Sequence, residues 1–340
     1  MKKIALLISS LSFGLLTFGQ QLPQSSMYMM NNYLLNPAEG GTEDFIDLQA
    51  GYRTQWVSFD EGKGPKTVYF SGHTPLGKHS VTKDTSHNYN NSELENFVKP
   101  MGYHGVGGVI FSDDAGHFQT LEIKGSYAYH MPMGKNFFLS FGGFLGIKQS
   151  KVDEEIEWNS AGQTDPVASN GEFNTALSPD LTLGIWGYHK KYYFGISSFQ
   201  VLGNPVQVAP DGSEGELQRH YYFTGGYKFD IVKSSVPTEE IFLVPSTLIK
   251  VLPGVPMTLD LNAKINFYHK YWGGVSFRLG NEAESLVLLA GITLKDLVDI
   301  GYSYDITLNG LNQVSNGSHE IMVGLRLPNH QHHAPPKQFW

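Results

Sequence analysis

Residues 258–267 read Thr-Leu-Asp-Leu-Asn-Ala-Lys-Ile-Asn-Phe, a strict alternation of polar and apolar side chains. Successive side chains of a β-strand point to opposite faces, so Leu259 and Leu261 share one face while Asp260 and Asn262 share the other. A soluble sandwich also produces this pattern, with its apolar face turned to a core. The chain repeats the pattern over most of its length and begins with an export signal. Together these features predict a transmembrane barrel with lipid outside and a polar lumen inside.

The first residues have the features of an export signal. Lys2 and Lys3 precede a mostly apolar run over residues 4–18, and small residues form a cleavage site before Gln20. This pattern predicts a secretory signal peptide over residues 1–19; the alternative, a retained anchor, is disfavoured by the short apolar core. No later stretch approaches the ~18 apolar residues of a membrane helix. A membrane-inserted mature chain must therefore be a closed sheet.

The composition agrees with this class. Charged residues make up only 16% of the chain, against about 25% in average proteins, while aromatic residues reach 13% and there are 38 glycines. The absence of cysteine excludes disulfides, thiolate chemistry and a lipidated N-terminal cysteine. The formal net charge is −8, and loss of Lys2 and Lys3 with the signal makes it −10. A net acidic exported protein is a poor candidate for nucleic-acid binding.

Period-two patterning predicts fourteen strands, an even number as in most bacterial barrels. The predicted strands are 45–52, 67–73, 104–112, 118–130, 135–150, 179–190, 192–202, 216–230, 241–251, 257–268, 271–278, 285–293, 298–307 and 317–326. Two of them, 135–150 and 241–251, are apolar on both faces, which leaves their orientation open. The expected fold class is thus all-β, an antiparallel transmembrane barrel of about 14 strands.

The predicted connections differ in length between the two ends of the barrel. If the N-terminus is periplasmic, strand parity places short connections in the periplasm and long ones outside. The short ones are 131–134, 191, 269–270 and 294–297, and the long ones are 53–66, 151–178, 203–215 and 308–316. Residues 74–103 are an exception, because they are long and polar yet fall on the periplasmic side. Either a strand pair is missing there, or this insertion plugs the lumen or meets a periplasmic partner.

Four regions follow from these patterns: a signal peptide at 1–19, an N-terminal segment at 20–44, the barrel at 45–327 and a tail at 328–340. The N-terminal segment contains Met-Tyr-Met-Met and Asn-Pro-Ala and is too apolar for a free tail. We expect it at the periplasmic mouth or in the lumen, with Tyr28, Asn36 and Pro37 among its contact residues. The tail contains three histidines without a second cluster, so a disordered tail is favoured over a metal site.

No motif for catalysis or cofactor binding is present, so we expect no enzyme, no cofactor and no metal. Asp113-Asp114 and Glu154-Glu155 are predicted to be solvated turns, with calcium binding as the alternative. Inward-facing charges of both signs predict internal ion pairs instead of a selective pore. These charged residues are Glu122, Lys124, Asp260, Lys264, Asp299, Asp305, Glu320 and Arg326.

Several short motifs, spread in order over the mature chain, carry a family resemblance. They are Gln20-Gln21-Leu22-Pro23-Gln24, Leu35-Asn36-Pro37-Ala38, Tyr52-Arg53-Thr54-Gln55-Trp56, His73-Thr74-Pro75-Leu76-Gly77, Ser126-Tyr127-Ala128-Tyr129-His130, Gly301-Tyr302-Ser303-Tyr304-Asp305 and Gly317-Ser318-His319-Glu320-Ile321-Met322. On these residues the chain resembles the PorP/SprF family of Bacteroidota outer-membrane proteins. The insertion at 78–103 and the histidine-rich tail depart from the family pattern.

The resemblance implies a non-enzymatic accessory barrel of the type IX secretion system in the cell outer membrane, sometimes tied to gliding motility. It implies three kinds of partner: the C-terminal domain of a secreted adhesin, periplasmic or outer-membrane proteins of the secretion machine, and outer-membrane lipid. It carries no catalytic residues across.

Aromatic residues on the predicted outer loops are the candidate partner-binding residues: Trp56, Phe59, Trp158 and Phe173. The alternative is that these rings lie at the membrane interface. A transport channel is the competing function, because the Asn-Pro-Ala element is also similar to long-chain fatty acid transporters with a lumen hatch. An outer-membrane enzyme is a third reading, which the missing motifs disfavour.

Overall fold

The structure is a computed structural model that describes residues 24–58, 64–77, 101–116, 118–134, 136–152, 176–207, 214–233, 240–280 and 284–329. The predicted signal peptide, most of the 78–103 insertion and nearly all of the tail lie outside this part. No described helix has the length and apolarity for a membrane crossing. Four short 3-10 helices are described: η1 (Tyr28–Met30), η2 (Asn32–Leu34), η3 (Pro37–Glu39) and η6 (Gly310–Gln313).

Almost all other regular structure is β-strand. The strands are β1 (Phe45–Thr54), β2 (Lys66–Leu76), β3 (Tyr103–Ala115), β4 (Phe118–Pro132), β5 (Phe137–Val152), β6 (Ala176–His189), β7 (Tyr192–Phe199), β8 (Pro205–Gln207), β9 (Glu214–Glu216), β10 (His220–Tyr227), β11 (Phe229–Val232), β12 (Ile241–Val251), β13 (Thr258–Phe267), β14 (Tyr271–Leu279), β15 (Ser285–Leu294), β16 (Val298–Thr307) and β17 (Ser318–Pro328).

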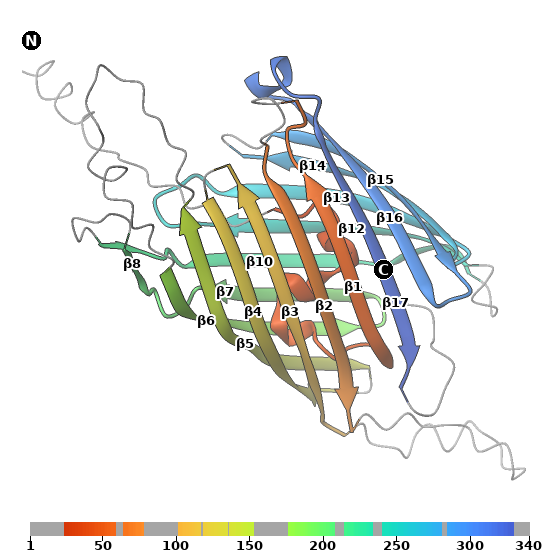
Figure 1. Cartoon of the computed structure of the whole chain (residues 1–340). Helices are drawn as coiled ribbons and strands as arrows, with labels where there is room; N and C mark the ends of the chain where they lie inside the picture. Colours follow the sequence, from red (N-terminus) through yellow and green to blue (C-terminus); the bar gives the residue numbers. More distant parts are fainter. Residues whose placement is uncertain are drawn as a thin grey trace, which may run out of the picture.

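Fourteen of these strands form a closed antiparallel barrel, which confirms the predicted fold class. Each strand pairs with its neighbours in sequence, β1 pairs with β17, and the β10–β12 pairing closes the ring. The short β11 continues β10 beyond Lys228 and also pairs with β12, whereas β8 and β9 form a separate hairpin. Figure 1 shows the strands inclined side by side around the wall.

The connections divide the barrel into two ends. The short-turn end contains residues 133–136, 190–191, 268–270 and 295–297, and also the β2–β3 connection. The opposite, long-loop end joins β1 to β2, β5 to β6 and β16 to β17. Parity therefore assigns the polar 78–103 insertion to the short-turn end, as the sequence indicated. No strand pair is described there, and residues 78–100 lie outside the described residues.

Burial alternates along the strands as the sequence pattern requires. In β13, Leu261 is 46% exposed on the outer surface, whereas Asn262 is 6% exposed and faces inward. In β4, outward Ile123 and Tyr127 are exposed, while inward Lys124 is buried. The outer wall is thus a continuous apolar surface that only lipid can cover favourably.

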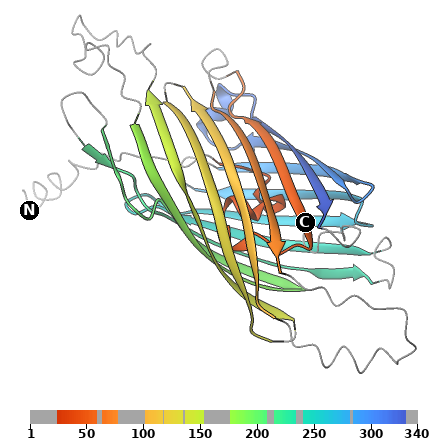
Figure 2. The same cartoon turned by 60° about the horizontal axis from the view of Figure 1, so that its bottom comes forward.

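The described part of the N-terminal segment, residues 24–44, runs inside this ring of strands (Figure 2). Tyr33 hydrogen-bonds to Ser126 of β4 at 2.5 Å, and Asn31 donates to Ser71 of β2 at 2.8 Å. Ser26 donates to Asp305 of β16 at 2.6 Å, on a strand far round the ring from β4. Contacts with strands spread around the whole ring are possible only from within it.

An apolar cluster occupies part of the interior, beside the polar lining that the sequence predicted. Its residues are Met27, Tyr28, Met29, Met30, Ala38, Trp186, Tyr193, Phe199, Tyr222, Leu248, Trp272, Val287, Leu289 and Met322. The cluster exists because the apolar N-terminal segment needs apolar wall residues to pack against. The segment 241–251 is apolar on both faces because β12 turns Phe242, Val244 and Leu248 inward, and Leu248 belongs to the cluster.

One local prediction is wrong. Asp113 and Asp114 were predicted to lie in a solvated turn, but they belong to the end of β3. Asp113 accepts a hydrogen bond from Thr67 of β2 at 2.6 Å, so cross-strand pairing with a hydroxyl replaces hydration. Glu154 and Glu155 lie outside the described residues.

Candidate functional site

A cluster of six charged side chains surrounds Ser26 inside the barrel, toward the long-loop end. This Ser26 charge cluster consists of Arg53, Lys250, Asp260, Arg278, Asp305 and Glu320. Arg53 lies 2.8 Å from Asp305 and 3.3 Å from Glu320. The Ser26 backbone N–H donates to Glu320 at 2.7 Å, and Arg53 donates to the Ser26 hydroxyl at 2.9 Å. The N-terminal segment therefore completes a buried ionic network.

Two smaller ionic groups lie elsewhere on the inner wall. Lys124 bridges Glu122 at 2.5 Å and Asp180 at 3.0 Å, and Arg326 contacts Asp299 through two bonds of 2.6 and 2.7 Å. Buried charges are tolerated only when paired in this way. The prediction that the inward charges form internal ion pairs is thus met for these residues.

Some inward charges were missed at the level of sequence. Arg278, Lys250 and Asp180 belong to the networks but were not among the predicted lumen charges. A usable signal was present, because Arg278 continues the inward set of β14 that contains Trp272 and Ser276. Which charge would pair with which depends on the register between strands distant in sequence.

Asn36 and Pro37 lie against glycines of the wall. The Asn36 amide donates to the carbonyl oxygens of Ile185 and Ile196 at 2.9 and 3.1 Å, joining β6 and β7 to the segment. A Cβ atom added to Gly142 of β5 would lie 2.6 Å from the Ala38 Cα, closer than real Cβ atoms approach. Only glycine permits this approach of the two backbones.

Two tyrosines of the segment complete its polar contacts. Tyr28 accepts a hydrogen bond from Asn262 of β13, and Tyr33 pairs with Ser126 of β4. Burial raises the pKa of both phenols, and nearby Asp260 adds to the effect on Tyr28. Both hydroxyls therefore remain protonated at physiological pH and hold fixed positions. Tyr28, Asn36 and Pro37 are all buried.

Histidines fix the segment where it leaves the interior, at the short-turn end. His130 donates from Nε2 to the Gly40 carbonyl at 2.9 Å, and the Gly41 N–H donates to His73 Nδ1 at 3.1 Å. The hydroxyl of Ser126, which lies in the same strand as His130, hydrogen-bonds to Tyr33. Both groups hold the segment, and neither hydrogen-bonds to the other in the described contacts.

The predicted partner-binding aromatics are only partly described. Trp56 lies in the β1–β2 connection at the long-loop end, half-buried and with a left-handed φ of 49°. Its neighbour Val57 exchanges backbone hydrogen bonds with Asn316 and Gly317 before β17, at 2.7 and 2.8 Å. The other three aromatics, Phe59, Trp158 and Phe173, lie outside the described residues. The loop that contains Trp56 is thus hydrogen-bonded to the loop that precedes β17.

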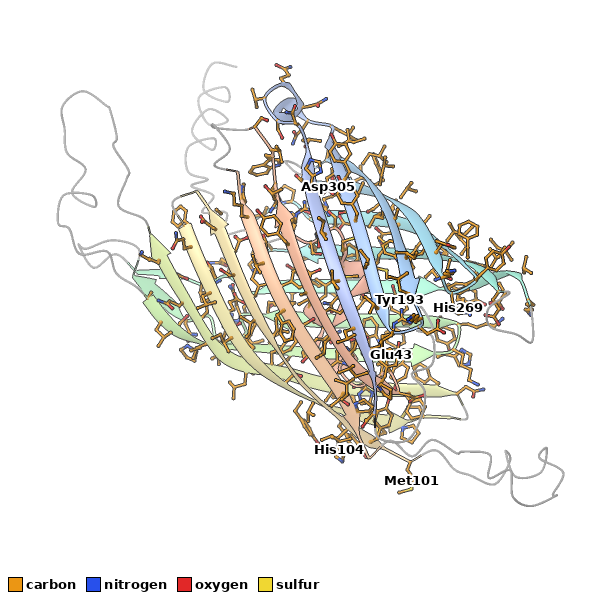
Figure 3. The ribbon with its side chains drawn as sticks, turned by 45° about the vertical axis from the view of Figure 1, so that its right-hand side comes forward. Glu43, Met101, His104, Tyr193, His269 and Asp305 are labelled. Atoms are coloured by element: carbon orange, nitrogen blue, oxygen red, sulfur yellow. The ribbon has the colours of Figure 1, made fainter. Side chains whose placement is uncertain are left out.

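Among the described residues, no group of three or more His, Cys, Asp or Glu side chains is arranged to hold a metal ion. Figure 3 shows Asp305 of the Ser26 charge cluster toward one end of the barrel, and Met101 and His104 at the other. The N-terminal segment spans much of the distance between them, from Ser26 to Gly41.

The closed barrel, its apolar outer wall and its occupied interior define an integral protein of the outer membrane. Residues 17–325 match the family described as type IX secretion system membrane protein PorP/SprF, and the chain belongs to this family. No curated protein matches the chain.

Solved structures similar to the chain are bacterial barrels. The CymD monoaromatic hydrocarbon channel has a TM-score of 0.49 at 11% identity, covering 93% of this chain and 96% of that one. The toluene transporter TbuX of Ralstonia pickettii has a TM-score of 0.49 at 9% identity, covering 90% and 94%. The outer membrane protein Omp33 of Acinetobacter baumannii has a TM-score of 0.44 at 8% identity, covering 84% and 100%.

Proposed function

We propose that this barrel is a non-enzymatic accessory subunit of a type IX secretion or gliding machine. In this proposal its long-loop end holds the C-terminal domain of a secreted adhesin. Its short-turn end faces the periplasm and contacts components of the machine. The family match over residues 17–325 is the observation that carries the proposal.

The occupied interior favours a role in binding proteins over a role in conducting solutes. The N-terminal segment, its apolar cluster and the Ser26 charge cluster use inward-facing side chains from strands around the ring. The outward face is apolar and belongs to lipid. The two ends are then the surfaces left for proteins, and aromatic residues such as Trp56 are suited to such interfaces.

A deletion pair in the native bacterium tests the assignment of the two ends. Removing residues 160–172 should leave the barrel folded and heat-modifiable but abolish surface retention of one class of adhesin. The matched variant removes residues 80–98 from the short-turn end and should impair recovery of machine components by affinity purification. Normal adhesin display without 160–172, together with its loss without 80–98, would show that the periplasmic contact carries the function.

Conductance in planar bilayers tests the competing channel function. The occupied interior predicts no large, stable single-channel current from the full-length barrel. Steady current of solute-pore size would overturn the accessory role and favour a transport channel.

A further inference from the structure

Lysines recur at the short-turn end on neighbouring connections around half of the ring. Lys190 and Lys191 form the β6–β7 turn, Lys233 follows β11, Lys270 ends the β13–β14 turn, and Lys295 begins the β15–β16 turn. These connections are consecutive around the barrel, because β7, β10, β12, β13, β14, β15 and β16 are neighbours in the ring. The lysines therefore form one arc along the rim.

Four of these lysines have charges that are not neutralised locally. Lys190, Lys233, Lys270 and Lys295 are exposed, and none forms an ion pair with a carboxylate of the described residues. Two of the described acids nearby have other partners, because Asp230 bridges Lys191 at 3.3 Å and Glu240 lies 3.4 Å from Lys228 and His269. A third, Asp296, follows Lys295 in the chain and forms no ion pair with it in the described residues. Lys228 itself points inward, over the Phe242 ring.

Net charge along this arc is opposite in sign to that of the whole chain. In the sequence, residues 190–191, 228–240, 268–270 and 295–297 contain six lysines (190, 191, 228, 233, 270 and 295) and four carboxylates (Asp230, Glu239, Glu240 and Asp296), a balance of +2, whereas the chain carries −8. At the long-loop end of the same half of the barrel, the connections 252–257 and 308–317 contain no charged residue, and the connections 200–219 and 280–284 contain five carboxylates and one arginine. The connections of this half of the barrel therefore carry a net positive charge at the short-turn end and a net negative charge at the long-loop end.

Exposed apolar side chains place the arc relative to the membrane. Tyr192, Phe229, Tyr271 and Leu294 are all outward-facing and exposed, within a few residues of the lysines. The Lys270 ammonium lies over the Tyr271 ring, 5.5 Å from its centroid, so this charge lies at the edge of the apolar surface. A cation immediately beyond the apolar band lies at the level of lipid phosphates.

We propose that Lys190, Lys233, Lys270 and Lys295 form a binding arc for the headgroups of anionic phospholipids in the periplasmic leaflet. The lysine ammonium groups complement the phosphate of a headgroup that has no cationic group of its own. The arc is also continuous with the apolar wall that contacts the acyl chains. Lys191, already paired with Asp230, contributes less.

Electron spin resonance with spin-labelled lipids tests this site on the full-length barrel in phosphatidylcholine bilayers. Spin-labelled phosphatidylglycerol should associate about fivefold more strongly than spin-labelled phosphatidylcholine, the effect of roughly one lysine near a charged surface. The preference should decrease at high salt, because these charges are exposed to solvent.

The decisive variant replaces all four lysines by glutamine and should bring phosphatidylglycerol to the level of phosphatidylcholine. Its matched control is K66Q with K151Q, two exposed lysines toward the long-loop ends of β2 and β5, which should keep the preference. Heat modifiability reports whether each variant is folded. An unchanged preference in the fourfold variant overturns the proposal. The same holds if that variant loses a periplasmic protein partner while its lipid preference stays, because the lysines would then serve that partner.

Discussion

Leu261 and Asn262 are neighbours in β13, but Leu261 lies on the outer face of the barrel and Asn262 on the inner face. Leu261 faces lipid, where any apolar side chain of similar size satisfies the environment. Asn262 donates to the Tyr28 hydroxyl and the Ser246 carbonyl, two specific partners. The outer face of the barrel therefore accepts any apolar residue of suitable size, whereas the inner face requires particular residues that match their hydrogen-bonding partners. The predictions below test this difference, from the largest expected effect to the smallest.

Removing a charge from the Ser26 charge cluster should have the largest effect. In Arg53→Met, Asp305 and Glu320 lose the cation that lies 2.8 and 3.3 Å away, and an unpaired buried charge costs about 3–5 kcal/mol. Urea unfolding in detergent micelles measures the loss. Lys66→Met on neighbouring β2, exposed and outside the cluster, should stay within about 0.5 kcal/mol of wild type. Similar values for both would show that the inner ion pairs are not specific.

The outer face should respond to depth in the membrane. Leu261→Arg places a cation against acyl chains and should cost about 2–4 kcal/mol, while Phe267→Arg at the strand's short-turn end should cost about 0–1 kcal/mol. The heat-modifiability midpoint of each folded barrel reports the difference. Two equally mild substitutions would mean that this face of β13 does not contact lipid.

Close packing of the N-terminal segment allows a test with two adjacent glycines. Gly142→Ala brings a methyl group within 2.6 Å of the Ala38 Cα and should cost about 1–3 kcal/mol. Gly143→Ala faces the other way, where the nearest atoms are 3.4 Å away, and should be nearly neutral. Protease susceptibility of the segment around Asn36 should rise only in the first variant. Equal susceptibility would indicate that the segment does not depend on this contact.

The smallest effect concerns pH at the short-turn end. Burial lowers the pKa of His269 below its ordinary value of 6.5, against an opposing contribution from Glu240 and with a further decrease from Lys228 and Arg326. The unfolded chain then binds the proton more readily, so this contribution to stability is complete above pH 6.5 and is lost as the pH falls below it. Comparing urea midpoints of wild type and His269→Asn between pH 7.5 and 5 isolates this contribution. A difference between them that does not change with pH would contradict it.

The positions of the strands were predictable because the outer face of every strand contacts the same environment, the lipid bilayer. The predicted segment 298–307 coincides with β16, and 257–268 differs from β13 by one residue at each end. Such patterns arise locally, since lipid on one side is enough to impose period two. The prediction for Asp113 and Asp114 was wrong because two adjacent carboxylates suit a turn as well as the end of a strand. The Thr67 hydroxyl that pairs with Asp113 comes from neighbouring β2, which local sequence does not show.

The sequence by itself determined the class of protein, the number of strands, the two unequal ends and the presence of an apolar N-terminal segment. Each of these depends on the order of apolar and polar residues along the chain, because water and lipid act on each side chain where it lies. Tertiary structure alone decided that Ser26 completes an ionic network and that Asn36 joins β6 to β7. The same holds for the arc of lysines, which comes from turns far apart in the chain. These contacts depend on the closure and register of the ring, because they bring together residues separated by up to about 300 positions, beyond the reach of any local pattern.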